Sequence, residues 1–271
     1  MKTTTQAVII GGGVVGASVL YHLAKFGWTD VALVERKVLT AGSSWHAAGG
    51  IHALNADPNI AQLQAYTIDL LSEIEQESGQ NIGLHMTGGL TMAGTPDRWE
   101  WLQSAYRVFQ SIGIEDCRLV TPQEARELNP IMSTDGLLGG MWADREGYID
   151  TTGTVHAYAG AAKKRGAEVI EHNRVLELHQ TSDGWDVVTE KGTIHTEHVV
   201  NAGGLWAREV GAMAGVYLPL HPMEHQYIVT DDIPEIYNRD SEHPHVIDPG
   251  GESYLRQEGR GLCIGFYEKT C

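Results

Sequence analysis

The sequence contains few residues that could cross-link it or anchor it in a membrane. Its three cysteines, Cys117, Cys263 and Cys271, form no CxxC pair and lack the spacing of a zinc site. No apolar run approaches the roughly 20 residues that a membrane-spanning helix needs. The first residues, MKTTTQAVII, lack the features of a signal or transit peptide. We therefore expect a soluble protein of the cytoplasm, or of the mitochondrial matrix in a eukaryote, that performs no thiol redox chemistry.

Basic residues are also scarce, because 19 Lys and Arg face 35 Asp and Glu and leave a net charge of −16. A surface of this charge repels nucleic acids and anionic membranes, so we expect neither as a partner. The 271 residues, 42% of them hydrophobic, suffice for the core of one large or two ordinary domains. A small molecule is the partner that fits this composition best.

The N-terminal residues 6–35 carry the first informative motif. A β-branched run is followed by a glycine cluster, an apolar helical pattern and a second short apolar run that ends in Glu35. Gly11, Gly13 and Gly16 form GxGxxG: the first allows a tight turn, the second lets a pyrophosphate approach, and the third lets helix and strand pack closely. Glu35 follows Gly16 by 19 residues, where a carboxylate accepts hydrogen bonds from a ribose. The pattern predicts dinucleotide binding and disfavours NADP, but it does not separate FAD from NAD.

Further along the chain, helical patterns alternate with strands. Thr121 and Glu124 predict a capping box at the start of one helix. In residues 175–204, apolar and polar residues alternate on either side of the turn pairs Asp183-Gly184 and Lys191-Gly192. This pattern predicts a three-stranded meander that returns to the first sheet. We expect an α/β fold with a Rossmann-like nucleotide-binding domain and a discontinuous antiparallel β-sheet substrate domain. The expected ranges are 1–85 and 150–215 for the first domain and 86–149 and 216–271 for the second.

The most specific segment is LTAGSSWHAAGG, from Leu39 to Gly50. With VIIGGGVVGASVLYHLAKFG before it and VVNAGGLWAREVG after it, the sequence resembles the dimethylglycine and sarcosine dehydrogenase family over essentially its whole length. These enzymes are flavoprotein amine oxidoreductases built on the D-amino-acid-oxidase plan. The resemblance implies that the bound nucleotide is FAD, and that it is attached covalently to His46 through the 8α-methyl group of the flavin.

The resemblance also implies which residues contact FAD. Val14 and Val15 would contact the pyrophosphate, and Glu35 and Arg36 the adenosine end. The remaining implied contacts are the glycines of the GxGxxG turn, the ribityl and flavin segment made of Gly42, Ser43, Ser44, Trp45, His46, Ala47, Ala48, Gly49 and Gly50, the adenine contact Val175, and the phosphate neighbours Ala202, Gly203 and Trp206.

For the chemical step, the resemblance points to His225 in MEHQY and Tyr254 in ESYLRQ, both of which we expect on strands of the substrate domain. A neutral His225 would accept a proton from the substrate ammonium, and Tyr254 would bind the substrate carboxylate or the histidine. The other histidines, including His221, His243 and His245, lack the spacing of a metal site, and we predict none.

The implied reaction is oxidative N-demethylation of dimethylglycine or sarcosine by hydride transfer to FAD. Electrons would then pass to an electron-transfer flavoprotein or to O₂. In the family, a C-terminal domain that resembles the glycine-cleavage T-protein passes the one-carbon unit to tetrahydrofolate. That domain and a late glycine-rich strand are not in this sequence, so we expect an N-terminal fragment of a longer enzyme. Two alternatives stay open: an oxidase of another secondary amine or of a D-amino acid, and a non-catalytic flavin-binding protein.

Overall fold

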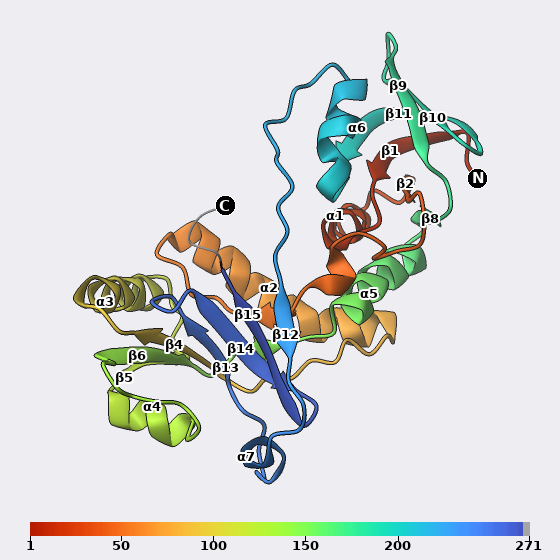
Figure 1. Cartoon of the computed structure of the whole chain (residues 1–271). Coiled ribbons are helices and arrows are strands. Elements are labelled where there is room, and N and C mark those ends of the chain that lie inside the picture. Colours follow the sequence, from red (N-terminus) through yellow and green to blue (C-terminus); the bar gives the residue numbers. More distant parts are fainter. Residues whose placement is uncertain (268–271) are drawn as a thin grey trace. The chain divides into compact units, whose positions relative to one another are not determined.

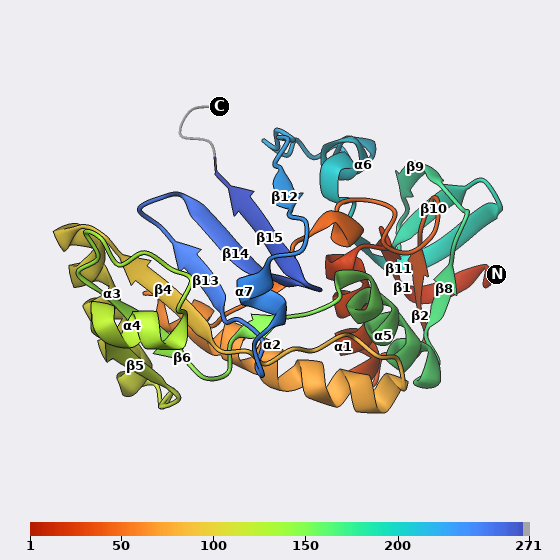
Figure 2. The same ribbon diagram turned by 60° about the horizontal axis from the view of Figure 1, so that its bottom comes forward.

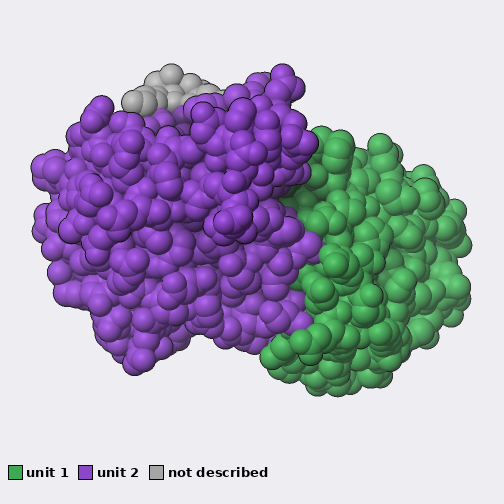
Figure 3. All heavy atoms as spheres, turned by 90° about the horizontal axis from the view of Figure 1, so that it is seen from below, with its two compact units in different colours: residues 1–47, 73–82, 150–223 green, residues 48–72, 83–149, 224–271 purple. Residues whose placement is uncertain are grey.

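The computed structural model describes residues 1–267 and divides into two compact units, coloured separately in Figure 3. Unit 1 consists of residues 1–47, 73–82 and 150–223. Unit 2 consists of residues 48–72, 83–149 and the described residues from 224 onward. The sequence-based ranges placed 48–72 with the nucleotide-binding part, whereas by compactness this stretch groups with unit 2. Cys271 and the end of the expected 216–271 segment lie outside the described residues.

Unit 1 is built on a six-stranded sheet in the order β8-β2-β1-β11-β10-β9 (Figure 1). The strands from β8 to β11 are parallel, and β11, β10 and β9 continue as the antiparallel meander that the sequence predicts. The strand bounds are Thr4–Ile10 (β1), Val31–Val34 (β2), Glu168–Ile170 (β8), Val175–Gln180 (β9), Trp185–Thr189 (β10) and Gly192–Asn201 (β11).

Helices cover both faces of this sheet, which explains why β2 and the last four residues of β1, from Ala7 to Ile10, are apolar and buried. On one face, α1 (Val14–Lys25) packs on β1 and β2 and against α5 (Thr151–Lys164). The buried residues of α1 recur at helical spacing: Gly16, Ala17, Leu20, Tyr21 and Ala24. On the other face, α6 (Ala207–Met213) joins the cluster of Val8, Ile10, Ala32 and Val34 through Val210.

Unit 2 is built on a seven-stranded sheet in the order β12-β15-β14-β13-β4-β6-β5. Neighbouring strands are antiparallel except β13 and β4, which run parallel. The strand bounds are Gly89–Ala93 (β4), Cys117–Val120 (β5), Gly139–Ala143 (β6), Tyr227–Val229 (β12), His245–Asp248 (β13), Ser253–Glu258 (β14) and Gly261–Phe266 (β15). A small second sheet pairs β3 (Gly50–Ile51) with β7 (Gly147–Tyr148).

Helices α3 (Pro96–Ser111) and α4 (Pro122–Leu128) both pack on β5 and β6 of this sheet (Figures 1 and 2). The capping box predicted at Thr121 and Glu124 is confirmed at the start of α4. Residues 1–267 contain two further α-helices, α2 (Pro58–Ser78), which begins in unit 2, and the short α7 (Pro234–Tyr237). No helix of the described chain is both long and apolar enough to span a bilayer.

One expected strand placement is wrong. His225 does not lie on a strand, because residues 221–226 have no regular structure and β12 begins only at Tyr227. The two prolines and the polar residues of LPLHPMEH limit ladder formation before this point, since proline lacks the N–H that a strand must donate. Tyr254 does lie on a strand, β14.

Unit 2 also buries a carboxyl group, that of Glu146 in the turn between β6 and β7, with 3% of the residue exposed. The backbone N–H of Ala53 donates to its Oε1 at 3.3 Å. Burial raises the pKa of Glu146 to about 8, although the backbone hydrogen bonds from Ala53 and Leu54 oppose the shift. The group is therefore mostly protonated near neutral pH.

This raised pKa predicts a pH-dependent stability. Between the ordinary pKa of 4.5 and about 8, the unfolded chain releases the Glu146 proton while the folded chain keeps it. The stabilisation is thus complete below the lower value and is lost as the pH rises towards the upper one. In urea denaturation at pH 5 and pH 8, Glu146→Gln should lose less stability between the two pH values than the wild type. Glu100→Gln, at an exposed residue of α3, is the control, and equal pH dependence in all three proteins would contradict the assignment.

Candidate functional site

In the turn between β1 and α1, the backbone closely approaches the backbone at the end of β11. A Cβ on Gly11 would lie 2.3 Å from the Ala202 carbonyl oxygen, and Gly11 has φ +116°, which favours glycine. A Cβ on Gly16 would lie 1.9 Å from the Gly11 carbonyl oxygen. No side chain fits at either position, so the end of β11, the β1 turn and the start of α1 meet directly.

Glu35, the first residue after β2, is fixed against this turn. Its Oε2 accepts from the N–H of Gly12 at 2.7 Å and its Oε1 from the N–H of Lys37 at 2.8 Å. Each carboxylate oxygen has a second lone pair, so the group can still accept from a ribose hydroxyl. Helix α1 begins nearby with no acidic residue in its first turn, and its positive dipole end is available to a phosphate.

A cavity of about 510 Å³ opens over this turn, entirely within unit 1. Arg36 and Trp206, which both line the cavity, are stacked: the guanidinium carbon lies 3.5 Å from the centroid of the indole ring. The Oγ of Ser44 accepts from the N–H of Val14 at 2.9 Å and ties the segment after Gly42 to the start of α1. The cavity brings together these predicted residues: Gly11, Gly13, Val14, Val15, Glu35, Arg36, Gly42, Ser43, Ser44, Val175, Ala202, Gly203 and Trp206.

Other predicted cofactor residues do not line this cavity. Gly16 is buried beneath the turn, while Trp45 and His46 are exposed in a 3₁₀ turn (Ser44–His46) with ring centroids 3.7 Å apart. Ala47 ends the first stretch of unit 1, and Ala48, Gly49 and Gly50 belong to unit 2.

Several lining residues were not among those predicted from the sequence, including Gly12, Arg174, Asn201 and Met213. Gly12 lay inside the recognised glycine cluster. Asn201 lay inside VVNAGG, and Arg174 directly precedes Val175, so proximity to recognised motifs was the available signal. No sequence signal pointed to Met213, because it reaches the cavity from α6.

In unit 2 the two predicted catalytic residues lie close together. The ring centroids of His225 and Tyr254 are 6.2 Å apart. Tyr267, which sequence analysis did not single out, stacks on His225 at 4.6 Å and 15°. Burial raises the pKa of Tyr254, with smaller contributions from Cys263, Tyr267 and Tyr227, so its hydroxyl stays protonated and can donate a hydrogen bond.

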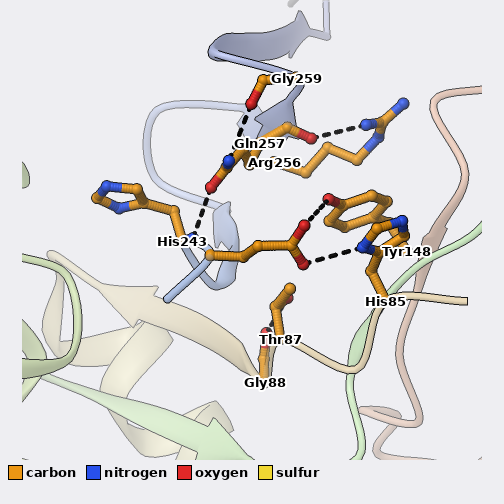
Figure 4. A network of polar contacts seen from close by, with 9 residues as sticks. His85, Thr87, Gly88, Tyr148, His243, Arg256, Gln257 and Gly259 are labelled. Carbon is orange, nitrogen blue, oxygen red and sulfur yellow. Dashed lines mark hydrogen bonds and ion pairs between the residues drawn. The ribbon is translucent and has the colours of Figure 1, made fainter. Parts of the chain in front are cut away.

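A second polar cluster adjoins β14 (Figure 4). The Glu242 carboxylate binds both His85 Nδ1, at 2.9 Å, and the Tyr148 hydroxyl, at 3.3 Å. The Tyr148 ring stacks on His85 and lies 4.7 Å from the Arg256 guanidinium. Arg256 also donates to the Ala48 carbonyl and is two residues from Tyr254, on the same face of β14. The members of this cluster are far apart in the chain, so the sequence did not predict it.

Within residues 1–267, no group of three or more His, Cys, Asp or Glu side chains is arranged to hold a metal ion. His243 and His245 are buried in unit 2, and burial lowers the pKa of each.

Comparison with known proteins agrees with these features. Residues 6–270 match the family described as FAD dependent oxidoreductase, and the chain belongs to this family. It is 39% identical to rat mitochondrial dimethylglycine dehydrogenase and 37% identical to human mitochondrial sarcosine dehydrogenase, with 98% and 99% of the chain covered. The chain spans only 31% and 29% of the lengths of these two relatives. Among solved structures, L-proline dehydrogenase from P. horikoshii matches with a TM-score of 0.87 and 28% identity, over 98% of this chain and 70% of that one.

The unit 1 cavity fits the cofactor that the family implies. A glycine turn without room for side chains, a helix start free of acids and a fixed carboxylate are the three elements that a dinucleotide requires. Gly11 to Val15 would receive the pyrophosphate and Glu35 the ribose, and the apolar Val175, Val210 and Met213 would face the adenine. FAD is therefore the cofactor for which this site is suited.

The close contact at Gly16 yields a direct test. Gly16→Ala must push α1 away from the β1 turn, and overpacking of this kind typically costs about 1–3 kcal/mol. If this cost falls on the FAD-bound form, FAD affinity should fall by about fivefold to a hundredfold. Flavin content after gel filtration and titration of the apoprotein with FAD measure the effect. Gly160→Ala in α5 is the matched control, because a Cβ there would lie 3.7 Å from Ser78, an ordinary contact. Equal FAD affinity of the two variants would rule out the proposed turn geometry.

Proposed function

We propose that this chain forms part of an enzyme that oxidatively demethylates a small N-methylated amino acid, dimethylglycine or sarcosine. The similarity to two dehydrogenases named for these substrates supports the substrate class. Unit 1 would be the FAD-binding part and unit 2 the substrate part. The final electron acceptor, an electron-transfer flavoprotein or O₂, belongs to the same proposal.

The observation that carries the proposal is the proximity in unit 2 of the His225 ring to that of Tyr254, whose hydroxyl stays protonated. When bound, FAD supplies the hydride acceptor for the N-methyl carbon. His225 would take the proton of the substrate ammonium, because only the free amine has a lone pair that assists C–H cleavage. The Tyr254 hydroxyl would donate a hydrogen bond to the substrate carboxylate.

Neighbouring residues support these roles electrostatically. Arg256 brings positive charge to the same face of β14, although Glu258 pairs with it at 2.7 Å. Its position is held by the Tyr148 ring and by the Ala48 carbonyl, so the charge is fixed rather than mobile. A fixed charge of this kind favours a carboxylate-bearing substrate, since it need not be reoriented on binding.

His46 would hold FAD covalently. It lies two residues after the last of the cavity-lining residues Gly42, Ser43 and Ser44, and its imidazole is exposed on the 3₁₀ turn rather than packed in the core. A side chain in this position is accessible to the flavin end of a nucleotide whose adenosine end occupies the cavity.

Covalent attachment is tested by denaturation. In the flavin-loaded protein, the yellow colour should remain with the wild-type pellet after acid precipitation and pass to the supernatant in His46→Ala. His156→Ala, at an exposed position of α5, is the control and should retain the flavin in the pellet. Complete release of flavin from the wild type would disprove the covalent bond.

The role of His225 is tested by stopped-flow reduction of the bound flavin without O₂. His225→Gln should slow reduction by an N-methylated glycine by about 10²–10⁴-fold, the usual contribution of general-base assistance. His221→Gln, at an exposed residue four positions earlier, is the control and should reduce at the wild-type rate. Unchanged kinetics of His225→Gln across pH would remove this residue from the mechanism.

The same anaerobic experiment separates the proposal from its alternatives. Reduction of the bound flavin by dimethylglycine or sarcosine supports the proposed reaction. Reduction only by another secondary amine or by a D-amino acid supports a different oxidase. A flavin that no amine reduces supports a non-catalytic flavin-binding protein.

A further inference from the structure

The strands β12, β15 and β14 lie side by side in the unit 2 sheet (Figures 1 and 2), and their register places two tyrosines on one face of it. Gly265 in β15 pairs with Tyr227 of β12 on one side and with Tyr254 of β14 on the other. Directly paired residues of neighbouring strands point to the same face. Tyr227 and Tyr254 therefore flank a position that has no side chain.

The missing side chain at Gly265 makes room for Tyr254. A Cβ on Gly265 would lie 2.1 Å from Cζ and 2.4 Å from the hydroxyl oxygen of Tyr254. The phenol ring thus lies across β15 instead of standing upright on β14. This orientation brings it next to Tyr267, with ring centroids 5.8 Å apart.

Tyr267 continues the register of β15 by one residue beyond the strand. Its N–H donates to the Glu252 carbonyl at 2.7 Å, one step past the Ser253–Phe266 pair. In the register that pairs Tyr227 with Gly265, the residue opposite Tyr267 is His225. The two rings stack at 4.6 Å with an interplanar angle of 15°.

His225 needs such a neighbour if it is to act as a base. It lies two residues before β12 in a segment without regular structure, and it is exposed. A flat aromatic surface beneath the imidazole restricts its rotation and favours one orientation of its nitrogens. We propose that Tyr267 is a positioning residue that holds the His225 imidazole in its working orientation by ring stacking. This inference rests on the proposed function, which makes His225 the base.

The stacking itself is tested without flavin or substrate. In carbon–proton correlation spectra of the histidine-labelled protein, the ε1 signal of His225, identified by its loss in His225→Gln, should be displaced upfield by the Tyr267 ring current. Tyr267→Leu should move this signal downfield, and Tyr267→Phe should leave it upfield. Phe266→Leu is the matched control, because Phe266 is a comparably exposed aromatic residue on the opposite face of β15.

The consequence for the reaction is tested in the flavin-loaded protein. An aromatic pair is worth about 0.5–1.5 kcal/mol, so Tyr267→Leu should lower the limiting rate of flavin reduction by about twofold to tenfold. Substrate concentration at half-maximal rate should change much less, since positioning of the base acts on the chemical step. Tyr267→Phe should recover most of the lost rate, which a requirement for the hydroxyl would not allow.

The outcomes separate this inference from the function on which it rests. If His225→Gln does not slow reduction, the proposed base is wrong, while the spectra still decide whether the rings stack. If His225→Gln is slow but Tyr267→Leu matches Phe266→Leu in both spectra and rate, the positioning role of Tyr267 is overturned. If Tyr267→Leu fails to fold, a wild-type His225 signal without upfield displacement overturns it equally.

Discussion

The contact between the β1 turn and the end of β11 is the constraint on which the rest of unit 1 depends. Gly11 and Gly16 leave no space for a Cβ, and the Ala202 carbonyl occupies the place that a side chain would take. Because three backbone segments meet there, β11 can pair with β1 over its length, from Thr4 to Ile10. The same absence of side chains opens the cavity above the turn, so that packing and cofactor binding have one common cause.

In unit 2, a glycine without space for a side chain has a different structural effect. At Gly265 the space is filled by the ring of Tyr254, which folds over β15 towards Tyr267. In unit 1 the glycine lets backbone approach backbone, whereas here it lets an aromatic ring lie flat on a sheet. The result is a clustered aromatic face in which His225, although outside the strand, has a defined neighbour.

The electrostatics of the two units also differ. In unit 1, Glu35 is stabilised by backbone N–H groups and Arg36 is stacked on Trp206, so both charges lie at the edge of a cavity. In unit 2, Glu146 is buried without a cation and its pKa rises to about 8, while His245 is buried and its pKa falls to about 4. Desolvation neutralises these interior groups, whereas near Tyr254 Arg256 and Glu258 form an ion pair on β14.

The sequence alone determined what depends on neighbours along the chain. The glycine turn, the capping box at Thr121 and the meander that ends at Asn201 follow from local backbone rules, and the structure confirms them. Local rules failed at His225, because the strand that alternating polarity predicted in this segment begins only at Tyr227. Tertiary structure alone decided the strand order of unit 2, the contact of Arg256 with Ala48 and the stacking of Tyr267 on His225. These contacts join residues that lie far apart in sequence, so that only the tertiary fold brings them together.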